Sequence, residues 1–81
     1  MKVIGYQKRE FNVNDNGTTK TIKGYNIFCA SELRDGVGMR PEDRFFASEY
    51  RLAECGYIPH VGDEIRVSFN QRGKLDYIVL I

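Results

Sequence analysis

Tyrosine and lysine side chains that alternate along one segment are the residues of this chain best suited to recognition chemistry. Within residues 21–30, a segment rich in β-branched and aromatic residues, Lys23 and Tyr25 stand two positions apart. As a β-strand, the segment places both side chains on one face, because successive side chains alternate between faces. On that face the ring and the lysine stem could cover a core, or the ring could stack on a flat ligand beside a charge that attracts phosphate.

A second strand-like segment, residues 2–13, extends this face across a hairpin. The Asn16-Gly17 pair between the two segments is a strong hairpin signal, because both residues tolerate positive φ. A two-residue turn pairs Lys8 with Tyr25, whereas a four-residue loop pairs Tyr6 with Tyr25, and both registers leave the faces unchanged. In either case four residues form a patch: Tyr6, Lys8, Lys23 and Tyr25. Toward the base of the hairpin we expect the same face to enter the core through Ile4, Ile27 and Cys29.

The opposite face of the hairpin carries apolar side chains close to the turn, at Phe11, Val13 and Ile22. These positions are too far along the hairpin for an ordinary closed core, so they favour contact with another molecule or subunit.

Further basic side chains could neutralise phosphate groups, and each neutralised phosphate would steepen the salt dependence of binding. They are Arg9 and Lys20 on the first hairpin, Arg66 on the outer face of a later strand, and Arg72 with Lys74 on the last hairpin.

The rest of the chain is expected to contain a loop, three strands and one short helix. In chain order they are a loop at 31–43, a strand at 44–48, a helix at 49–55, and two strands at 64–70 and 74–81. Ser48 could cap the helix and Gly56 could end it, while Gly5 marks a position for a bulge in the first strand. In the fourth strand the alternation directs three side chains inward: Ile65, Val67 and Phe69.

Five strands with a short helix between the third and the fourth are the ingredients of an OB-fold, a partly open Greek-key barrel. We therefore predict a mainly β, OB-fold-like Greek-key barrel of five strands with a protruding β-hairpin, as a single domain over residues 1–81. A chain of 81 residues is near the size at which one core is only marginally sufficient, so a dimer is a clear possibility.

Composition narrows the functional classes. The chain has 12 Lys and Arg against 11 Asp and Glu, a formal net charge of +1, so any nucleic-acid binding must come from where the charges lie. No apolar run is long enough for a signal peptide or a membrane span, which favours a cytoplasmic protein without membrane contact.

Cys29 and Cys55 lack CxxC spacing and are expected as free thiols, and His60 belongs to no Cys/His cluster. We expect no metal, no other cofactor, no small-molecule substrate and no enzymatic activity.

Taken over its whole length, the sequence resembles the small single-stranded-DNA-binding proteins of phages, of which the gene V (helix-destabilising) protein of filamentous phages is the best-known type. The resemblance spans most of the chain. It rests on the length, the long first hairpin, the run from Lys23 to Phe28, and the ending 62–69 with its tight hairpin and last strand 75–80. It implies a cytoplasmic homodimer that coats single strands, with Tyr25 at a base-stacking position and Lys20 and Lys23 at basic positions of the hairpin.

Two functional hypotheses follow. The first is a non-enzymatic, dimeric protein that binds single-stranded DNA, or RNA, with little sequence preference during replication or maintenance of a phage or mobile element. The second is a small β-barrel adaptor that docks a protein partner through the apolar side chains of its hairpin, Phe11, Val13 and Ile22. The two hypotheses differ in whether the tyrosine and lysine side chains or the apolar ones carry the binding.

Overall fold

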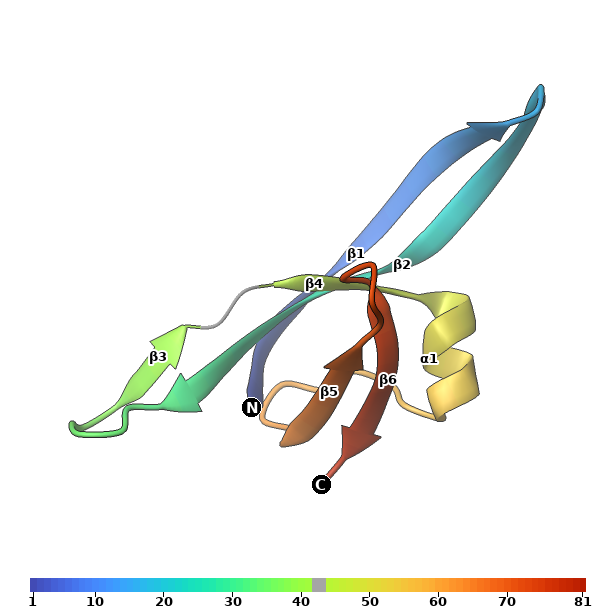
Figure 1. The fold of residues 1–81 in the computed structure, drawn as a ribbon. Helices are drawn as coiled ribbons and strands as arrows, with labels where there is room; N and C mark the ends of the chain where they lie inside the picture. The colour runs from blue at the N-terminus through green and yellow to red at the C-terminus, as the bar shows by residue number, and fades with distance from the viewer. Residues whose placement is uncertain (42–43) are drawn as a thin grey trace.

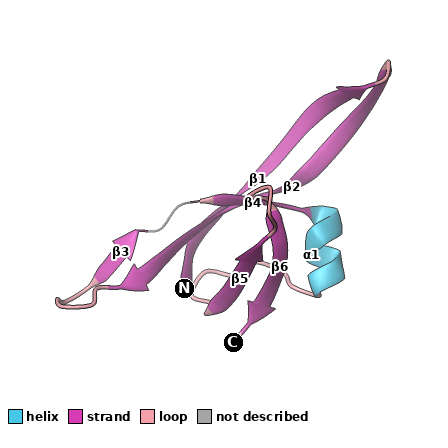
Figure 2. Cartoon of the chain, viewed as in Figure 1, coloured by secondary structure: helices cyan, strands magenta, loops and turns pink. Residues whose placement is uncertain are grey.

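The computed structural model describes residues 1–41 and 44–81, which form antiparallel β-sheets and one short helix (Figures 1 and 2). The elements are β1 (Lys2–Asp15), β2 (Thr18–Glu32), β3 (Met39–Pro41), β4 (Phe45–Ser48), α1 (Glu49–Cys55), β5 (Ile65–Phe69) and β6 (Leu75–Leu80). The prediction of a mainly β fold with one short helix is confirmed. The molecule measures 52 × 25 × 21 Å, and its long axis reflects the β1–β2 hairpin, which projects far beyond the body (Figure 1).

The β1–β2 hairpin turns through two residues. Asn16 and Gly17 have φ values of 51° and 79°, the positive values that a two-residue hairpin turn requires. Lys8 therefore pairs with Tyr25 and Glu10 pairs with Lys23, so the two-residue register is correct and the four-residue alternative is not. We call residues 7–23 the hairpin arm, whose side chains from 7 to 21 are all exposed.

The base of β1 contains the bulge predicted at Gly5, and this bulge changes which side chain enters the core. The register shifts between Val3 and Gly5, so that Val3 pairs with Cys29 and Gly5 pairs with Phe28. Ile4 is the extra residue of the bulge. Its side chain is 50% exposed, whereas Val3 is fully buried. The prediction that Ile4 joins the core was therefore wrong, because the bulge reverses the faces at this end of the strand.

Strand β2 is the centre of the first sheet. It pairs with β1 along one edge and with both β3 and β4 along the other. The predicted loop at 31–43 is corrected here, because β2 continues to Glu32 and then pairs with β3 as a second hairpin. Residues 42–43 of that segment lie outside the described residues. The described part of the chain thus contains six strands where five were predicted.

Helix α1 has the ends that its sequence predicts. Ser48 is the N-cap and its hydroxyl accepts a hydrogen bond from the backbone N–H of Arg51 at 3.1 Å. Gly56 ends the helix in the left-handed conformation, with φ of 65°. Leu52 is the buried residue of the helix, and it anchors α1 to the core.

The second sheet consists of β5 and β6 and is joined to the start of β1. Lys2 forms a bridge with Glu64, and the backbone N–H of Val3 donates to the carbonyl of Asp63 at 2.8 Å. In the described residues β6 pairs only with β5, so the two sheets do not close into a barrel. The side chains between them form one core: Val3, Ile27, Cys29, Ala47, Leu52, Tyr57, Ile65, Leu75 and Ile78.

The end of β5 departs from strict alternation. Ile65 is fully buried and Val67 packs against the core, as predicted, but Phe69 is 48% exposed. The register shifts between Ser68 and Phe69, where the ladder passes from Tyr77 to Leu75 on the partner strand. Phe69 consequently lies at the rim of the core, where its ring contacts that of Phe45.

Candidate nucleic-acid interface

Four side chains on one face of the hairpin make up a surface that we call the tyrosine patch: Tyr6, Lys8, Lys23 and Tyr25. The rings of Tyr6 and Tyr25 meet edge to face, with centroids 5.8 Å apart and an angle of 81° between their planes. Lys8 is directly across the ladder from Tyr25, and Lys23 precedes Tyr25 by two residues on the same face. The structure thus brings together the four residues that the sequence places in this patch.

The two rings of the tyrosine patch have different surroundings. Tyr25 is half-buried and packs against the core, whereas Tyr6 is 44% exposed. The register places Tyr6 opposite Ile27, so the contact between the rings runs diagonally across the ladder. Tyr25 therefore supports the ring of Tyr6, and Tyr6 is the member with more surface free to stack on a ligand.

The cations of the patch are exposed. Neither Lys8 nor Lys23 forms an ion pair within residues 1–41 and 44–81, although Glu10 is directly opposite Lys23. Exposed cations next to an aromatic ring can neutralise phosphates while the ring stacks on a base. The patch has this combination of groups.

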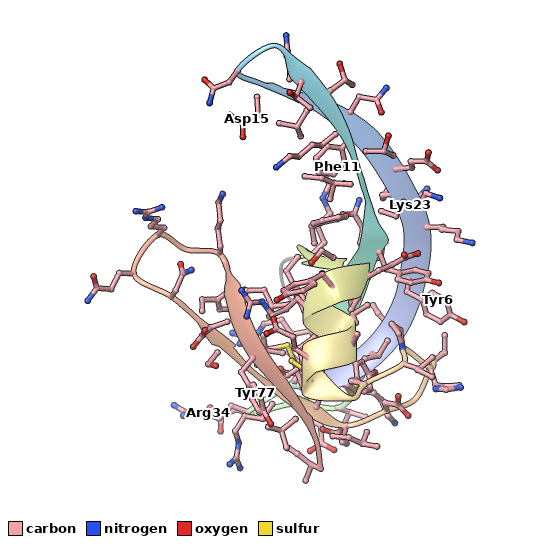
Figure 3. The ribbon with its side chains drawn as sticks, turned by 90° about the vertical axis from the view of Figure 1, so that its right-hand side faces the viewer. Tyr6, Phe11, Asp15, Lys23, Arg34 and Tyr77 are labelled. Atoms are coloured by element: carbon pink, nitrogen blue, oxygen red, sulfur yellow. The ribbon has the colours of Figure 1, made fainter. Side chains whose placement is uncertain are left out.

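Arg9 and Lys20 lie on the opposite face of the arm. Arg9 pairs with Gly24 and Lys20 pairs with Val13, in the same set of ladder positions as the Phe11–Ile22 pair. Because directly paired residues share a face, these two cations accompany the apolar side chains and not the tyrosines. Figure 3 shows Phe11 on the inner side of the curved arm, toward the β5–β6 hairpin, and Tyr6 and Lys23 toward its outer side.

The apolar side chains of the arm line a large groove. Phe11, Val13 and Ile22 lie along one wall of this groove, whose volume is about 1150 Å³. We call it the phenylalanine groove, because four phenylalanine rings line it: Phe11, Phe45, Phe46 and Phe69. Phe11 contacts Phe46 with ring centroids 5.3 Å apart, and Phe69 contacts Phe45 at 5.9 Å. Phe11 is thus partly covered within the chain itself.

Among the described residues, three basic side chains belong to the groove: Arg44, Arg51 and Lys74. No aspartate or glutamate of the same residues is among the side chains that line it. Arg51 donates to Glu54 at 3.1 Å, so one of these cations is partly neutralised. Of these residues, Lys74 was named from the sequence together with Arg72, whereas Arg44, Arg51, Phe45 and Phe46 were not singled out as site residues. Their adjacency in Arg44-Phe45-Phe46 was the available signal, since a strand end with a cation and two rings is suited to stacking and phosphate binding.

Two other predicted cations, Arg66 and Arg72, belong to the β5–β6 hairpin. Arg66 is on the exposed face of β5, opposite Val79. Arg72 lies in the turn between β5 and β6, where its backbone N–H donates to Oδ1 of Asn70 at 2.9 Å. The neighbours Gly73 and Lys74 line the phenylalanine groove, so Arg72 stands at the edge of that surface and Arg66 stands apart from it.

Tyr57, Asp63 and His60 form a separate polar cluster. The hydroxyl of buried Tyr57 donates to Oδ2 of Asp63 at 2.8 Å, and His60 Nδ1 lies 3.9 Å from the same oxygen. Burial raises the pKa of Tyr57, and the hydrogen bond to Asp63 raises it further. His60 is exposed, and Cys29 and Cys55 form no disulfide bond. Among the residues that the structure describes, no three His, Cys, Asp or Glu side chains gather closely enough to hold a metal ion.

Comparison of the chain with protein-family models, with curated proteins and with solved structures found no match. The resemblance to the phage proteins therefore rests on the residues quoted above. In the described part of the chain, no helix has the length and apolar composition needed to cross a bilayer.

Proposed function

We propose that this protein binds single-stranded DNA without sequence preference, by stacking bases on its tyrosine patch and by neutralising the phosphate backbone. The observation that carries the proposal is the exposed ring of Tyr6, which Tyr25 holds edge to face on a surface that also carries the exposed cations Lys8 and Lys23. Such a surface accepts any base, because every base has a flat π face.

The charge distribution of the hairpin arm supports binding to a polyanion. The arm carries four basic side chains, Lys8, Arg9, Lys20 and Lys23, against two acidic ones, Glu10 and Asp15. Its exposed position lets these cations reach phosphates along a strand. A local excess of cations is sufficient despite the net charge of +1, because phosphate binding depends on the charges within about one Debye length, roughly 8–10 Å.

The proposal includes an OB-fold-like relationship of the sheets, with β3 as an added strand and an open barrel. The long first hairpin and the short helix between β4 and β5 support it. It further includes a cytoplasmic homodimer, without enzymatic activity, that acts in the replication or maintenance of a phage or mobile element. The small core supports self-association, because the nine core side chains of the described residues are few for a stable monomer.

Fluorescence anisotropy of a labelled single-stranded oligonucleotide tests this function. We expect binding that weakens with salt and exceeds binding to a duplex of equal length, and a single-stranded RNA of the same sequence measures DNA preference. Tyr6→Ala should weaken binding about 5- to 150-fold, corresponding to roughly 1–3 kcal/mol for one stacked base. Tyr50→Ala is the matched control, because Tyr50 is 74% exposed on α1, outside the patch. Absence of binding at low salt, or equal effects of the two variants, would contradict the proposal.

The protein-partner hypothesis remains the alternative, and the effects of two variants on partner binding separate it from the first. Phe11→Ser removes an apolar side chain that the adaptor would need, while leaving the tyrosine patch intact. For an adaptor, the patch variant Tyr6→Ala should leave partner binding unchanged and Phe11→Ser should abolish it. The present surface favours nucleic acid, because Phe11 already contacts Phe46 and the groove around it is bordered by cations.

A further inference from the structure

The phenylalanine groove has the properties of a second binding site on this chain, separate from the tyrosine patch. We infer that the groove holds nucleotides of a single strand, with bases stacked on Phe11 and Phe69 and with the backbone along Arg44, Arg51 and Lys74. This inference rests on the proposed function and assigns it a further site. It involves residues from four parts of the chain: the arm, β4 with α1, β5 and the start of β6.

The aromatic rings of the groove are arranged in two supported pairs. In each pair a half-buried ring from β4, Phe46 or Phe45, holds a ring that is nearly half exposed, Phe11 at 44% or Phe69 at 48%. The planes are inclined by 58° in one pair and 83° in the other, so neither exposed ring is covered face to face by its partner. Each exposed ring is therefore held in place by its partner while nearly half of the residue stays open to solvent, the condition that stacking on a base requires.

Charge complementarity identifies a polyanion as the occupant. The described side chains that line the groove include three cations and no carboxylate. Arg44 and Lys74 form no ion pair with any described residue, whereas Arg51 is paired with Glu54, so the inference relies mainly on the first two cations. Rings without hydrogen-bonding groups do not select among bases, which suits a ligand whose charge repeats and whose sequence varies.

The size of the groove favours an extended ligand. Its volume of about 1150 Å³ exceeds the roughly 300–1,000 Å³ of sites for single small molecules. Arg9 and Lys20 continue the positive surface along the same face of the arm. A strand could thus leave the groove along the arm while remaining near cations.

The groove and the tyrosine patch occupy opposite faces of one hairpin. Phe11 pairs with Ile22, whereas Tyr6, Lys8 and Lys23 belong to the other set of ladder positions. A strand segment that stacks on Phe11 therefore does not stack on Tyr6 at the same point. The two sites should contribute separately to affinity, so that the weakening caused by a double variant is close to the product of the two single effects.

Binding of the labelled single-stranded oligonucleotide to groove variants tests the inference. Phe69→Ala should weaken binding about 5- to 150-fold, as expected for one stacked base. Tyr77→Ala is the control, because Tyr77 is 50% exposed on the same β5–β6 hairpin but does not line the groove. Lys74→Ala, which changes an exposed side chain, should lower the slope of log K against log salt by about 0.7, because one phosphate fewer is neutralised. Lys2→Ala, an exposed lysine outside the groove, should leave the slope unchanged.

Photo-crosslinking to an oligonucleotide that contains bromodeoxyuridine gives a second readout, which reports where the strand contacts the protein and not how tightly it binds. Cross-links on Phe11 or Phe69, located by mass spectrometry, would support the inference. If Tyr6→Ala weakens binding while Phe69→Ala and Lys74→Ala match their controls, the proposed function stands and the groove holds another ligand, such as an acidic peptide; that outcome overturns the inference. If the unmodified protein binds no single strand, both proposals fail.

Discussion

Gly24 of β2 lies against the backbone carbonyl of Ala47 in β4 so closely that no β-carbon would fit between them. A β-carbon at position 24 would also lie 2.7 Å from Cζ of Phe46 and 2.8 Å from Cα of Ser48. Gly24 is directly paired with Ser48 at the last rung of the β2–β4 ladder. The absence of a side chain therefore lets the end of β4, the ring of Phe46 and the start of α1 approach β2.

Gly24→Ala should destabilise the protein by about 1–3 kcal/mol, the usual cost of adding an atom to a closely packed site. Two of the three obstructing groups are backbone, which cannot move aside as a flexible side chain can. The midpoint of urea unfolding measures the change. Gly5→Ala serves as the control, because a β-carbon there meets nothing within 4 Å. A Gly24→Ala protein as stable as the Gly5→Ala protein would show that β4 does not approach β2 so closely.

Ser48→Ala should lower the free energy of unfolding by about 0.5–2 kcal/mol. The Ser48 hydroxyl caps helix α1, because it accepts a hydrogen bond from the backbone N–H of Arg51. Thermal unfolding followed by circular dichroism checks this value. Ser68→Ala is the matched change, since Ser68 is exposed on β5 and caps no helix. Equal unfolding temperatures for the two variants would rule out the capping role.

Tyr57 should make the protein less stable as the pH rises above about 10, the ordinary tyrosine pKa. Burial and the hydrogen bond to Asp63 raise its pKa in the folded state, so the unfolded chain loses this proton at a pH at which the folded chain still holds it. The stabilisation is complete below the unfolded pKa and is lost as the pH rises through the folded value. Urea unfolding at several pH values between about 8 and 11 measures the slope.

Tyr57→Phe removes the ionisable hydroxyl but keeps the buried ring, so its stability should fall less steeply above about pH 10. At neutral pH the same variant should lose about 0.5–1.5 kcal/mol with the hydrogen bond to Asp63. Tyr6, Tyr25, Tyr50 and Tyr77 are present in both proteins and therefore cancel in the comparison. Parallel pH profiles for the two proteins would disprove the role assigned to Tyr57.

Tyr25→Ala and Tyr6→Ala should separate stability from binding. Tyr25 packs against the core, so its removal should cost about 1–3 kcal/mol of folding free energy and also weaken single-strand binding. Removal of the more exposed Tyr6 side chain should cost about 1 kcal/mol of folding free energy or less, mainly because the edge-to-face contact is lost. Single-strand binding should still weaken. Unfolding midpoints and anisotropy titrations on the same samples test both. A larger loss of stability for Tyr6→Ala than for Tyr25→Ala would reverse our assignment of the supporting ring.

Features that depend on neighbouring residues could be predicted from the sequence. The Asn16-Gly17 turn, the capping of α1 by Ser48 and its ending at Gly56 are each decided by local φ preferences or by a side chain within three residues. The faces of the hairpin followed from the two-residue period of a strand, which is why the members of the tyrosine patch could be named before its geometry was known.

Features that depend on pairing between distant segments could not be predicted from the sequence. The bulge at Gly5 was expected, but only the partner strand determines that Val3 and not Ile4 is buried. Strand β3 forms because the end of β2 offers an open edge to residues 39–41, and no local pattern marks that edge. The exposure of Phe69 likewise depends on a register shift against β6.

The sequence by itself determined a mainly β chain with a long hairpin, a capped helix and a basic, aromatic arm, because alternation, turn residues and caps act over a few positions. Only the tertiary structure decided that Phe11 of the arm, Phe46 of β4, Phe69 of β5 and Lys74, directly before β6, border one groove. Their meeting depends on the curvature of the arm and on the approach of β4 to Gly24, which are set by packing between segments far apart in the chain.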